Sequence, residues 1–206
     1  MKRTIFLVVI FAIIGALACG RKVMVPPRID LTQHEIVGII QFESENKGNL
    51  ASYTTKRFTE AIRRDQAMIR IVDLGTDADV LTAIGHDRFS KAAFQEIGEK
   101  FDVATVIVGE LLVSDVRPNI SVALIFGMSV SAEVDATLDA KMVETETGAS
   151  LWSTSVTATR EIGHVSVWEG GGFIFDAEDP ERAYGKLVNA LVEDASRDFR
   201  VTWRRE

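Results

Sequence analysis

Histidines and paired carboxylates are the residues of this chain that could do acid–base or metal chemistry. The three histidines are His34, His86 and His164, and none has a second ligand at the spacing that a zinc-binding helix uses. His86 and Asp87 could form half of an acid–base pair, but a histidine in an exposed loop accounts for the same two residues. We therefore expect no metal site and no catalytic histidine.

The carboxylate pairs stand two residues apart, Glu133 with Asp135 and Glu144 with Glu146. Such a pair can hydrolyse a glycosidic bond if it lies in a cleft and one partner has a raised pKa, but solvated strand faces explain both pairs more simply. The glycines at 170–172 are not followed by Gly-Lys-Ser/Thr or by the start of a helix, as a phosphate loop would be. No serine lies in a Gly-x-Ser-x-Gly motif. We expect a protein that is not an enzyme and holds no cofactor.

Cys19 is the residue whose surroundings most clearly indicate a covalent modification. Lys2 and Arg3 precede an apolar run over 4–14, which is the order of charge and hydrophobicity in a secretory signal peptide. Ala16-Leu17-Ala18-Cys19 then resembles a bacterial lipobox, whose cysteine starts the mature chain and carries a diacylglycerol on its thiol and an N-acyl chain such as palmitate. Ordinary cleavage that leaves Cys19 as a free thiol is the alternative. As the only cysteine, it has no partner for a disulfide within the chain.

These features divide the chain into three parts. They predict a lipoprotein signal peptide over 1–18, the lipidated cysteine and a tether over 19–34, and one domain over 35–206. The tether contains two prolines and no sustained hydrophobic period, so we expect it to be extended. At about 3.3 Å per residue it would reach about 45 Å from the lipid.

The charge of the chain limits its partners. It contains 23 Lys and Arg against 30 Asp and Glu, a formal net charge of −7, and removal of Lys2 and Arg3 with the leader makes the mature chain −9. An acidic domain without a basic cluster is a poor match for nucleic acid and for anionic lipid headgroups. We expect no nucleic-acid partner, and attachment to outer-membrane lipid through the acyl chains on Cys19.

Hydrophobic periodicity predicts how the domain begins. Segments 35–42 and 68–74 are apolar on both faces, which indicates buried strands, and apolar residues at helical spacing predict a helix over 50–64 between them. A helix between two buried strands indicates a βαβ unit with parallel strands. Two further helices and a third buried strand are predicted over 76–84, about 89–100 and 103–113.

The second half of the domain predicts an antiparallel meander. Even positions are apolar from Val122 to Met142, and over 150–162 the apolar residues Trp152, Val156, Ala158 and Ile162 share one face. This pattern indicates two long strands with one buried face each. Arg117-Pro118-Asn119 predicts a turn before the first of them. The strand over 103–113, as the most continuous apolar run, is expected at the centre of the sheet.

The end of the chain predicts a hairpin and a helix. Gly163 to Ala177 has apolar residues alternating on both sides of the glycines, as in a flexible hairpin. Asp179-Pro180 matches a helix N-cap followed by proline at the first helical position. Trp203 is a candidate extension of that helix's apolar stripe.

The expected fold class is α/β (α+β mixed), with three layers around a mixed sheet of about five strands, a βαβ start, an antiparallel meander and a C-terminal helix. Behind a lipobox cysteine, this order resembles the CsgG-like periplasmic lipoprotein domain. That family includes the curli secretion channel, the amino-terminal domain of TolB and outer-membrane lipoproteins that activate penicillin-binding proteins. The resemblance rests on the segments IVGIIQF over 36–42, IVD over 71–73, FDVATVIVGE over 101–110 and VETETGASLWS over 143–153.

The resemblance implies a non-catalytic lipoprotein on the periplasmic face of the outer membrane that binds a protein partner in envelope assembly, secretion or wall synthesis. Gly20, where an aspartate would retain the protein at the inner membrane, implies outer-membrane sorting. Two alternatives remain open. One is a subunit of a homo-oligomeric CsgG-like secretion pore, which needs membrane strands of about 9–11 residues, and the other is a periplasmic enzyme of unknown reaction.

Contact with a partner or with the membrane is expected at two apolar places, the hairpin over 163–177 and the first half of the strand over 122–142. Burial of these side chains by the domain itself is the alternative. The candidate residues are Leu124, Ile125, Phe126, Val165, Val167, Trp168, Phe173 and Phe175.

Overall fold

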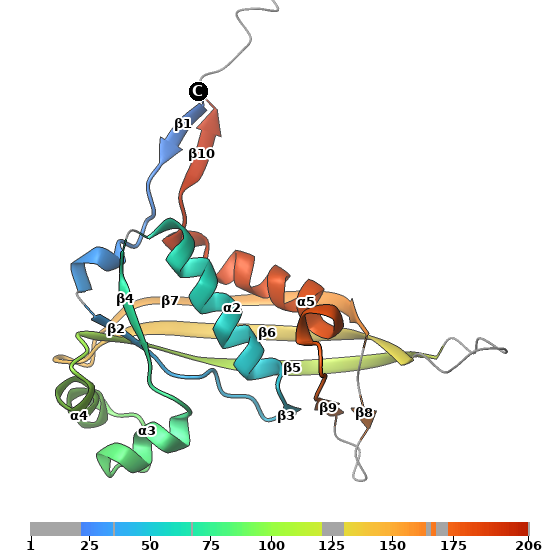
Figure 1. The fold of residues 1–206 in the computed structure, drawn as a ribbon, viewed down its shortest axis with the longest axis horizontal. Coiled ribbons are helices and arrows are strands. Elements are labelled where there is room, and N and C mark those ends of the chain that lie inside the picture. Colours follow the sequence, from blue (N-terminus) through green and yellow to red (C-terminus); the bar gives the residue numbers. More distant parts are fainter. Residues whose placement is uncertain are drawn as a thin grey trace, which may run out of the picture.

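The computed structural model describes residues 22–34, 36–66, 68–120, 130–163, 166–167 and 173–205. Their main sheet has five strands in the order β4-β2-β5-β6-β7 (Figure 1). Strand β2 is parallel to β4 and β5, whereas β5, β6 and β7 are antiparallel neighbours. The βαβ start, the meander and the central position of β5 are therefore confirmed. The bounds are Ile36–Ile39 (β2), Arg70–Asp73 (β4), Thr105–Ile120 (β5), Val130–Glu144 (β6) and Ser150–Ile162 (β7).

Helices cover the sheet from both sides, which confirms the three-layer fold. Helices α2 and α5 lie over one face, and α3 and α4 lie over the other (Figure 1). Alternate residues of β5 point to opposite faces, so Ile107 and Leu111 join the core under α2 and α5, while Val106 and Val108 join the core under α3 and α4. The helix bounds are Leu50–Asp65 (α2), Asp77–Ile84 (α3), Lys91–Phe101 (α4) and Pro180–Ala195 (α5).

Short strands form two small sheets beside the main one. One is a two-stranded antiparallel ribbon of β1 and β10, and the other has the order β3-β9-β8. Two 3-10 helices, η1 and η2, lie next to the ribbon in sequence. The bounds are Lys22–Val25 (β1), Leu31–His34 (η1), Lys47–Gly48 (β3), Ser166–Val167 (β8), Phe173–Phe175 (β9), Arg197–Phe199 (η2) and Thr202–Arg205 (β10).

Side-chain caps set the ends of α3 and α5 where the sequence predicts them. The Thr76 hydroxyl accepts a hydrogen bond from the Asp79 backbone N–H, and the Asp79 carboxylate accepts one from the Thr76 backbone N–H. Gly85 ends α3 with a φ of 72°, a conformation that glycine adopts without strain. Asp179 accepts from the Arg182 N–H, directly before Pro180.

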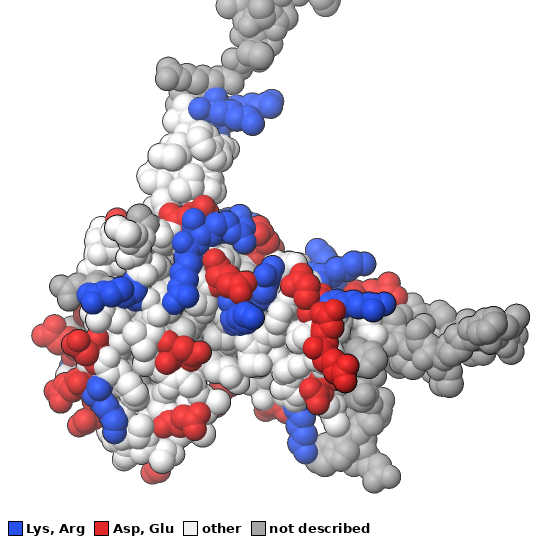
Figure 2. Space-filling view, viewed as in Figure 1, with Lys and Arg blue, Asp and Glu red and all other residues white. Residues whose placement is uncertain are grey.

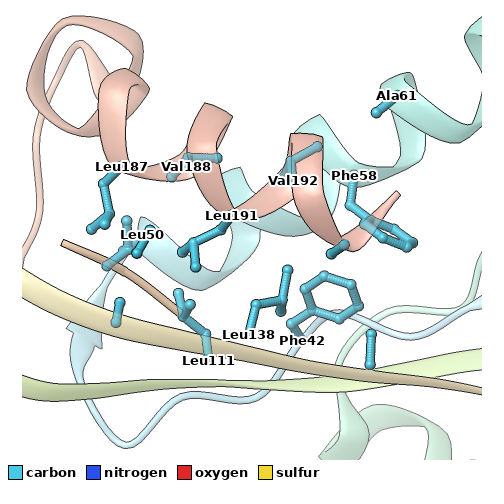
Figure 3. Close-up of a cluster of buried hydrophobic side chains, with 14 of the residues drawn as sticks. Phe42, Leu50, Phe58, Ala61, Leu111, Leu138, Leu187, Val188, Leu191 and Val192 are labelled. Carbon is cyan, nitrogen blue, oxygen red and sulfur yellow. The ribbon is translucent and has the colours of Figure 1, made fainter. Parts of the chain in front are cut away.

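The larger core lies between α2, α5 and the sheet (Figure 3). Even residues of β6 face it, from Ala132 to Met142, as their alternation predicts. At one end of this core the rings of Phe42, Phe58 and Phe199 pack edge to face. Helix α5 adds a stripe of buried residues at helical spacing, Tyr184, Leu187, Val188, Leu191, Val192 and Ala195.

The predicted tether over 19–34 differs from the structure from residue 22 onward. Strand β1 pairs with β10, and η1 brings Leu31 into the core. The Gln66 side chain accepts a hydrogen bond from the Leu31 N–H at 3.0 Å and donates to the Ile29 carbonyl at 2.8 Å. One buried side chain and a pairing with the opposite end of the chain hold this segment, so no local hydrophobic period marks it.

Two smaller predictions were wrong for similar reasons. Arg117-Pro118-Asn119 lies within β5, paired with 131–133 of β6, and is not a turn. Among the described residues, β5 pairs with β2 only over 105–107. At Pro118 the side of β5 that faces away from β6 therefore has no neighbouring strand, and a residue without an N–H is tolerated there. Trp203 lies in β10 and is 64% exposed, and it does not continue the stripe of α5.

Candidate functional site

Among the described residues, no helix covers one face of the half-sheet formed by β5, β6 and β7. Its other face packs on α2 and α5, while α3 and α4 pack on β2, β4 and the first residues of β5. Cross-strand pairs Glu110–Asp139, Leu112–Thr137, Asp139–Ser155 and Thr137–Thr157 therefore point outward together. We call this surface the open face, and it consists of Glu110, Leu112, Thr137, Asp139, Lys141, Ser153, Ser155 and Thr157.

The open face is polar, and hydroxyl groups dominate its part on β7. Ser153, Ser155 and Thr157 are exposed, and the Thr157 hydroxyl lies 2.9 Å from that of Thr137. This surface can form many hydrogen bonds but offers little apolar area, with Leu112 as its large hydrophobic residue at 36% exposed. Its hydroxyl groups can both donate and accept hydrogen bonds, whereas it has little area for an apolar ligand.

A hollow of about 550 Å³ lies at the foot of the open face, where the loop before α4 and the start of α3 approach the sheet. Asp77 and Glu43 stand on one side of it, and Asp139 and Lys141 stand on the other. Burial, together with the charge of Glu43 and a hydrogen bond to it, raises the pKa of Asp77 to about 7. In the described part of the chain, no group of three His, Cys, Asp or Glu residues could hold a metal ion.

The raised pKa of Asp77 makes stability depend on pH. An aspartate in an unfolded chain has a pKa near 4, so the folded state binds this proton more tightly than the unfolded state. The stability due to this proton is fully present below about pH 4 and is lost as the pH rises through about 7. Asp77→Asn should therefore flatten this loss, and at pH 8 it should raise the free energy of unfolding by about 1 kcal/mol, allowing for screening of a half-exposed carboxylate.

Urea unfolding of both proteins at pH 4, 6 and 8 measures this effect. Asp87→Asn, in the exposed loop that follows α3, makes the same chemical change away from the hollow and is the control. An Asp77→Asn difference that is equal at pH 4 and pH 8 would contradict the raised pKa.

The two carboxylate pairs noted in the sequence have different surroundings in the structure. Glu133 and Asp135 both pair with Arg117 on the neighbouring strand, at 2.6 Å and 3.1 Å. Glu144 ends β6 and Glu146 is exposed in the following turn. Both Glu144 and Glu146 line a second hollow, of about 730 Å³, together with Glu96 and Glu99 of α4.

The histidines within the described residues are also separated from these carboxylates. His34 lies in η1, where the sequence predicts a tether, and His86 follows the C-terminal end of α3. The backbone N–H of His86 donates to the Leu81 carbonyl, as part of the helix end. His164 lies outside the described residues.

The predicted lipidation site Cys19 lies outside the described part of the chain, and so do five of the eight predicted contact residues: Leu124, Ile125, Phe126, Val165 and Trp168. Val167 and Phe173 pair with each other in β8 and β9, the predicted hairpin. Phe175 is fully buried, with its ring 6.2 Å from that of Tyr184 on α5. Its side chain belongs to the core and is not available to a partner here, because β9 also pairs with β3 and is held against the domain.

Sequence reasoning missed the open face, although a signal for it was present. Odd positions from 153 to 159 are all Ser or Thr, which form hydrogen bonds and are common in strands. The alternation identified the buried face of β7 but not whether a helix covers the other face. That depends on where α3 and α4 pack, which no local pattern determines.

Comparison with known proteins gives structural matches only. No protein-family model and no curated protein matches the chain. The PelC dodecamer from Paraburkholderia phytofirmans matches with 14% sequence identity and a TM-score of 0.47, over 88% of this chain and 97% of that chain. The LpoB C-terminal domain from Salmonella enterica matches with 11% identity and a TM-score of 0.40, over 65% of this chain and 84% of that chain.

A third match is lipoprotein GNA1162 from Neisseria meningitidis, with 13% identity and a TM-score of 0.37, over 78% of this chain and 95% of that chain. At these scores the matches assign no function to this chain. None of the three bears the name of CsgG or TolB, and the resemblance to that family stays a prediction. The helices within the described ranges are too short or too polar to cross a membrane.

Proposed function

We propose that the protein is a non-catalytic lipoprotein, anchored through acylated Cys19 to the periplasmic face of the outer membrane, whose domain binds a protein partner in envelope assembly, secretion or wall synthesis. The observation that carries the binding role is the edge strand β7. It has 13 residues, it borders the open face, and no described strand pairs with its outer side.

Beyond a register shift at its start, where Ser150 pairs with Val143 and Trp152 with Met142, strand β7 lacks the usual protection of an edge. Natural edge strands are kept short or carry lysine, proline or bulges, because their free N–H and C=O groups otherwise pair with another chain. At the opposite edge β4 has only four residues. The segment of β7 from Leu151 to Thr159 contains no charged residue and no proline. A partner that adds a strand here would gain backbone hydrogen bonds, with side-chain selectivity supplied by the open face.

The anchor would keep this edge close to the membrane. Cys19 precedes β1 by three residues, which span at most about 10 Å, and the four-residue ribbon adds about 13 Å. The domain would thus be held within tens of ångströms of the bilayer, whereas a free tether of 15 residues would let it move farther away. Partners embedded in or attached to the same membrane are the ones in reach.

Site-directed photo-crosslinking in the producing cell tests this proposal. A crosslinking amino acid at position 155, on exposed β7, should trap an envelope protein, and Thr157→Lys in the same chain should reduce that adduct at least tenfold by burying a charge in the interface. The same crosslinker at position 82, exposed on α3, is the control and should trap nothing comparable. The mass of the purified mature chain would report acylation of Cys19.

Other results of the crosslinking and mass measurements would distinguish the alternatives. An adduct with a second copy, together with rings in detergent, would favour the homo-oligomeric alternative over a separate partner. Equal trapping from positions 155 and 82 would contradict binding at β7. A mature chain without acyl groups would refute the anchor while leaving the β7 result standing.

A further inference from the structure

The β1–β10 ribbon concentrates positive charge in a protein that is acidic overall. Lys22, Arg204 and Arg205 lie on it, and its eight residues include no acid. Together with their sequence neighbours Arg21 and Glu206, these residues have a formal net charge of +3, whereas the whole chain has a formal net charge of −7. Basic residues stand at the tip of the ribbon in Figure 2, whereas acidic residues are spread over the body.

The ribbon also exposes two large apolar side chains next to these cations. Met24 is opposite Trp203 and Lys22 is opposite Arg205, and residues two apart on a strand point to the same face. This face therefore carries the Lys22–Arg205 pair at the tip with Met24 and Trp203 directly behind it. Met24 is 55% and Trp203 is 64% exposed.

The ribbon projects from the body rather than packing on it (Figure 1). A two-stranded antiparallel pair on its own is marginal in water, and an exposed tryptophan beside it is unfavourable. Contact with another surface would stabilise the ribbon and would remove the tryptophan side chain from water. Tryptophan together with arginine and lysine is the combination that settles at the headgroup level of a bilayer.

The chain path determines which surface that is. Cys19 precedes Lys22 by three residues, so an acyl anchor there would hold the ribbon tip within about 10 Å of the lipid. A second copy of the chain is a poorer fit, because eight ribbon residues are far fewer than the 20–30 that each partner contributes to a stable interface.

We propose that the β1–β10 ribbon is a membrane-contact element. Lys22 and Arg205, together with Arg204 on the other face of the tip, bind phosphates of anionic phospholipids, and Trp203 with Met24 lies among the headgroups. This inference rests on the anchoring at Cys19 proposed above and adds a second attachment that orients the domain. It also revises the expectation from net charge, since an acidic total conceals a basic ribbon. A single acylated residue would let the domain rotate relative to the membrane, and a cationic ribbon bound to the lipid beside it would restrict that rotation.

Vesicle co-sedimentation tests the ribbon without the acyl chains. The chain over 19–206 with Cys19→Ser, made without the leader, keeps every contact described here. It should bind vesicles of phosphatidylethanolamine with phosphatidylglycerol, and should not bind neutral phosphatidylcholine vesicles. Arg204→Gln with Arg205→Gln should weaken binding by roughly fivefold per cation, or roughly 25-fold together. Binding should vanish in about 1 M salt, where charges are screened beyond about 3 Å.

The matched control is Lys56→Gln with Lys186→Gln. It makes the same change in net charge at exposed positions on α2 and α5, and it should alter binding by less than about twofold. All four substituted side chains are exposed, so the thermal unfolding of both double variants should match that of the parent. Equal weakening by the two double variants would show a general charge effect and overturn the proposal.

The acylated mature protein supplies the second readout. In vesicles that contain brominated phospholipid, the Trp203 fluorescence, taken as the difference from Trp203→Phe, should be quenched. Absence of quenching would overturn the headgroup position of Trp203. If light scattering without lipid shows that the arginine variants dissociate an oligomer, the ribbon joins copies of the chain and the proposal is wrong. A mature chain that carries no acyl groups would refute the anchor alone, because the unacylated vesicle assay does not depend on it.

Discussion

Replacing Phe58 with alanine is expected to lower the free energy of unfolding by about 3–5 kcal/mol. Phe58 is fully buried on α2, and its ring contacts three other aromatic rings, with centroid distances of 5.4 Å to Phe42, 6.2 Å to Phe199 and 6.5 Å to Trp152. Phe42 follows β2, Trp152 lies in β7 and Phe199 lies in η2. The cavity would therefore open where α2, the sheet and the C-terminal segment meet (Figure 3).

The size of this loss can be measured by thermal and denaturant unfolding. For a domain of this length about 1 kcal/mol corresponds to about 2–4 °C, so the midpoint should fall by roughly 10 °C. Phe58→Leu fills most of the volume and should cost less than about 1.5 kcal/mol. Trp203→Ala removes an aromatic ring that is 64% exposed and should stay within about 0.5 kcal/mol of the parent.

A Phe58→Ala loss no larger than that of Phe58→Leu would contradict this description of the core. It would mean that the surrounding rings collapse into the space, so that they are not held by the backbone segments that carry them. An equal loss in Phe58→Ala and Trp203→Ala would mean that the ribbon and not the core determines stability.

The elements that the sequence predicted well are those whose burial is periodic. Even positions of β6 are buried from Ala132 to Met142, and Trp152, Ala158 and Ile162 are buried on β7, because a strand with one buried face must alternate. The stripe of α5 is equally clear, since each turn of the helix places a residue against the sheet. Hydrophobic periodicity therefore sufficed for the main sheet and its helices.

The elements that were missed depend on partners distant in sequence. Strands β1 and β10 are four residues long and pair across most of the chain, from Lys22 with Arg205 to Val25 with Thr202. Neither has a pattern of its own, so a tether and a helix extension were reasonable predictions for them. Phe175 was missed for the same reason. As an apolar residue beside a run of glycines it was predicted to contact a partner, but β9 pairs with β3 and the Phe175 side chain is buried in the core.

The second large effect is expected at Gln66, which follows α2 and joins the two ends of the domain. Its side chain accepts from the Leu31 N–H at 3.0 Å and donates to the carbonyl oxygens of Ile29 and Phe199, both at 2.8 Å. Gln66 is 7% exposed. Ile29 and Leu31 follow β1 and Phe199 precedes β10, so this amide contacts the roots of both ribbon strands. The Ile29 N–H also joins the two roots directly, by donating to the Asp198 carbonyl at 2.9 Å.

Gln66→Ala should lower the free energy of unfolding by about 3 kcal/mol, because it leaves three backbone groups without this partner and each unsatisfied buried group costs about 1–3 kcal/mol before water reaches it. Denaturant unfolding measures the total. Hydrogen exchange should show the local part, with faster exchange of the backbone amides of β1 and β10 than of those in β6. The matched control is Gln95→Ala, whose exposed amide donates to the Glu146 carbonyl and which should cost less than about 0.5 kcal/mol.

The two readouts separate the possible roles of Gln66. A loss of stability with unchanged exchange in the ribbon would show that Gln66 stabilises the core through Leu31 alone. Equal costs for Gln66→Ala and Gln95→Ala would contradict the hydrogen bonds described here. If exchange in β1 and β10 accelerates as expected, the direct hydrogen bond between Ile29 and Asp198 is not enough to hold the roots of the ribbon without the buried amide at the end of α2.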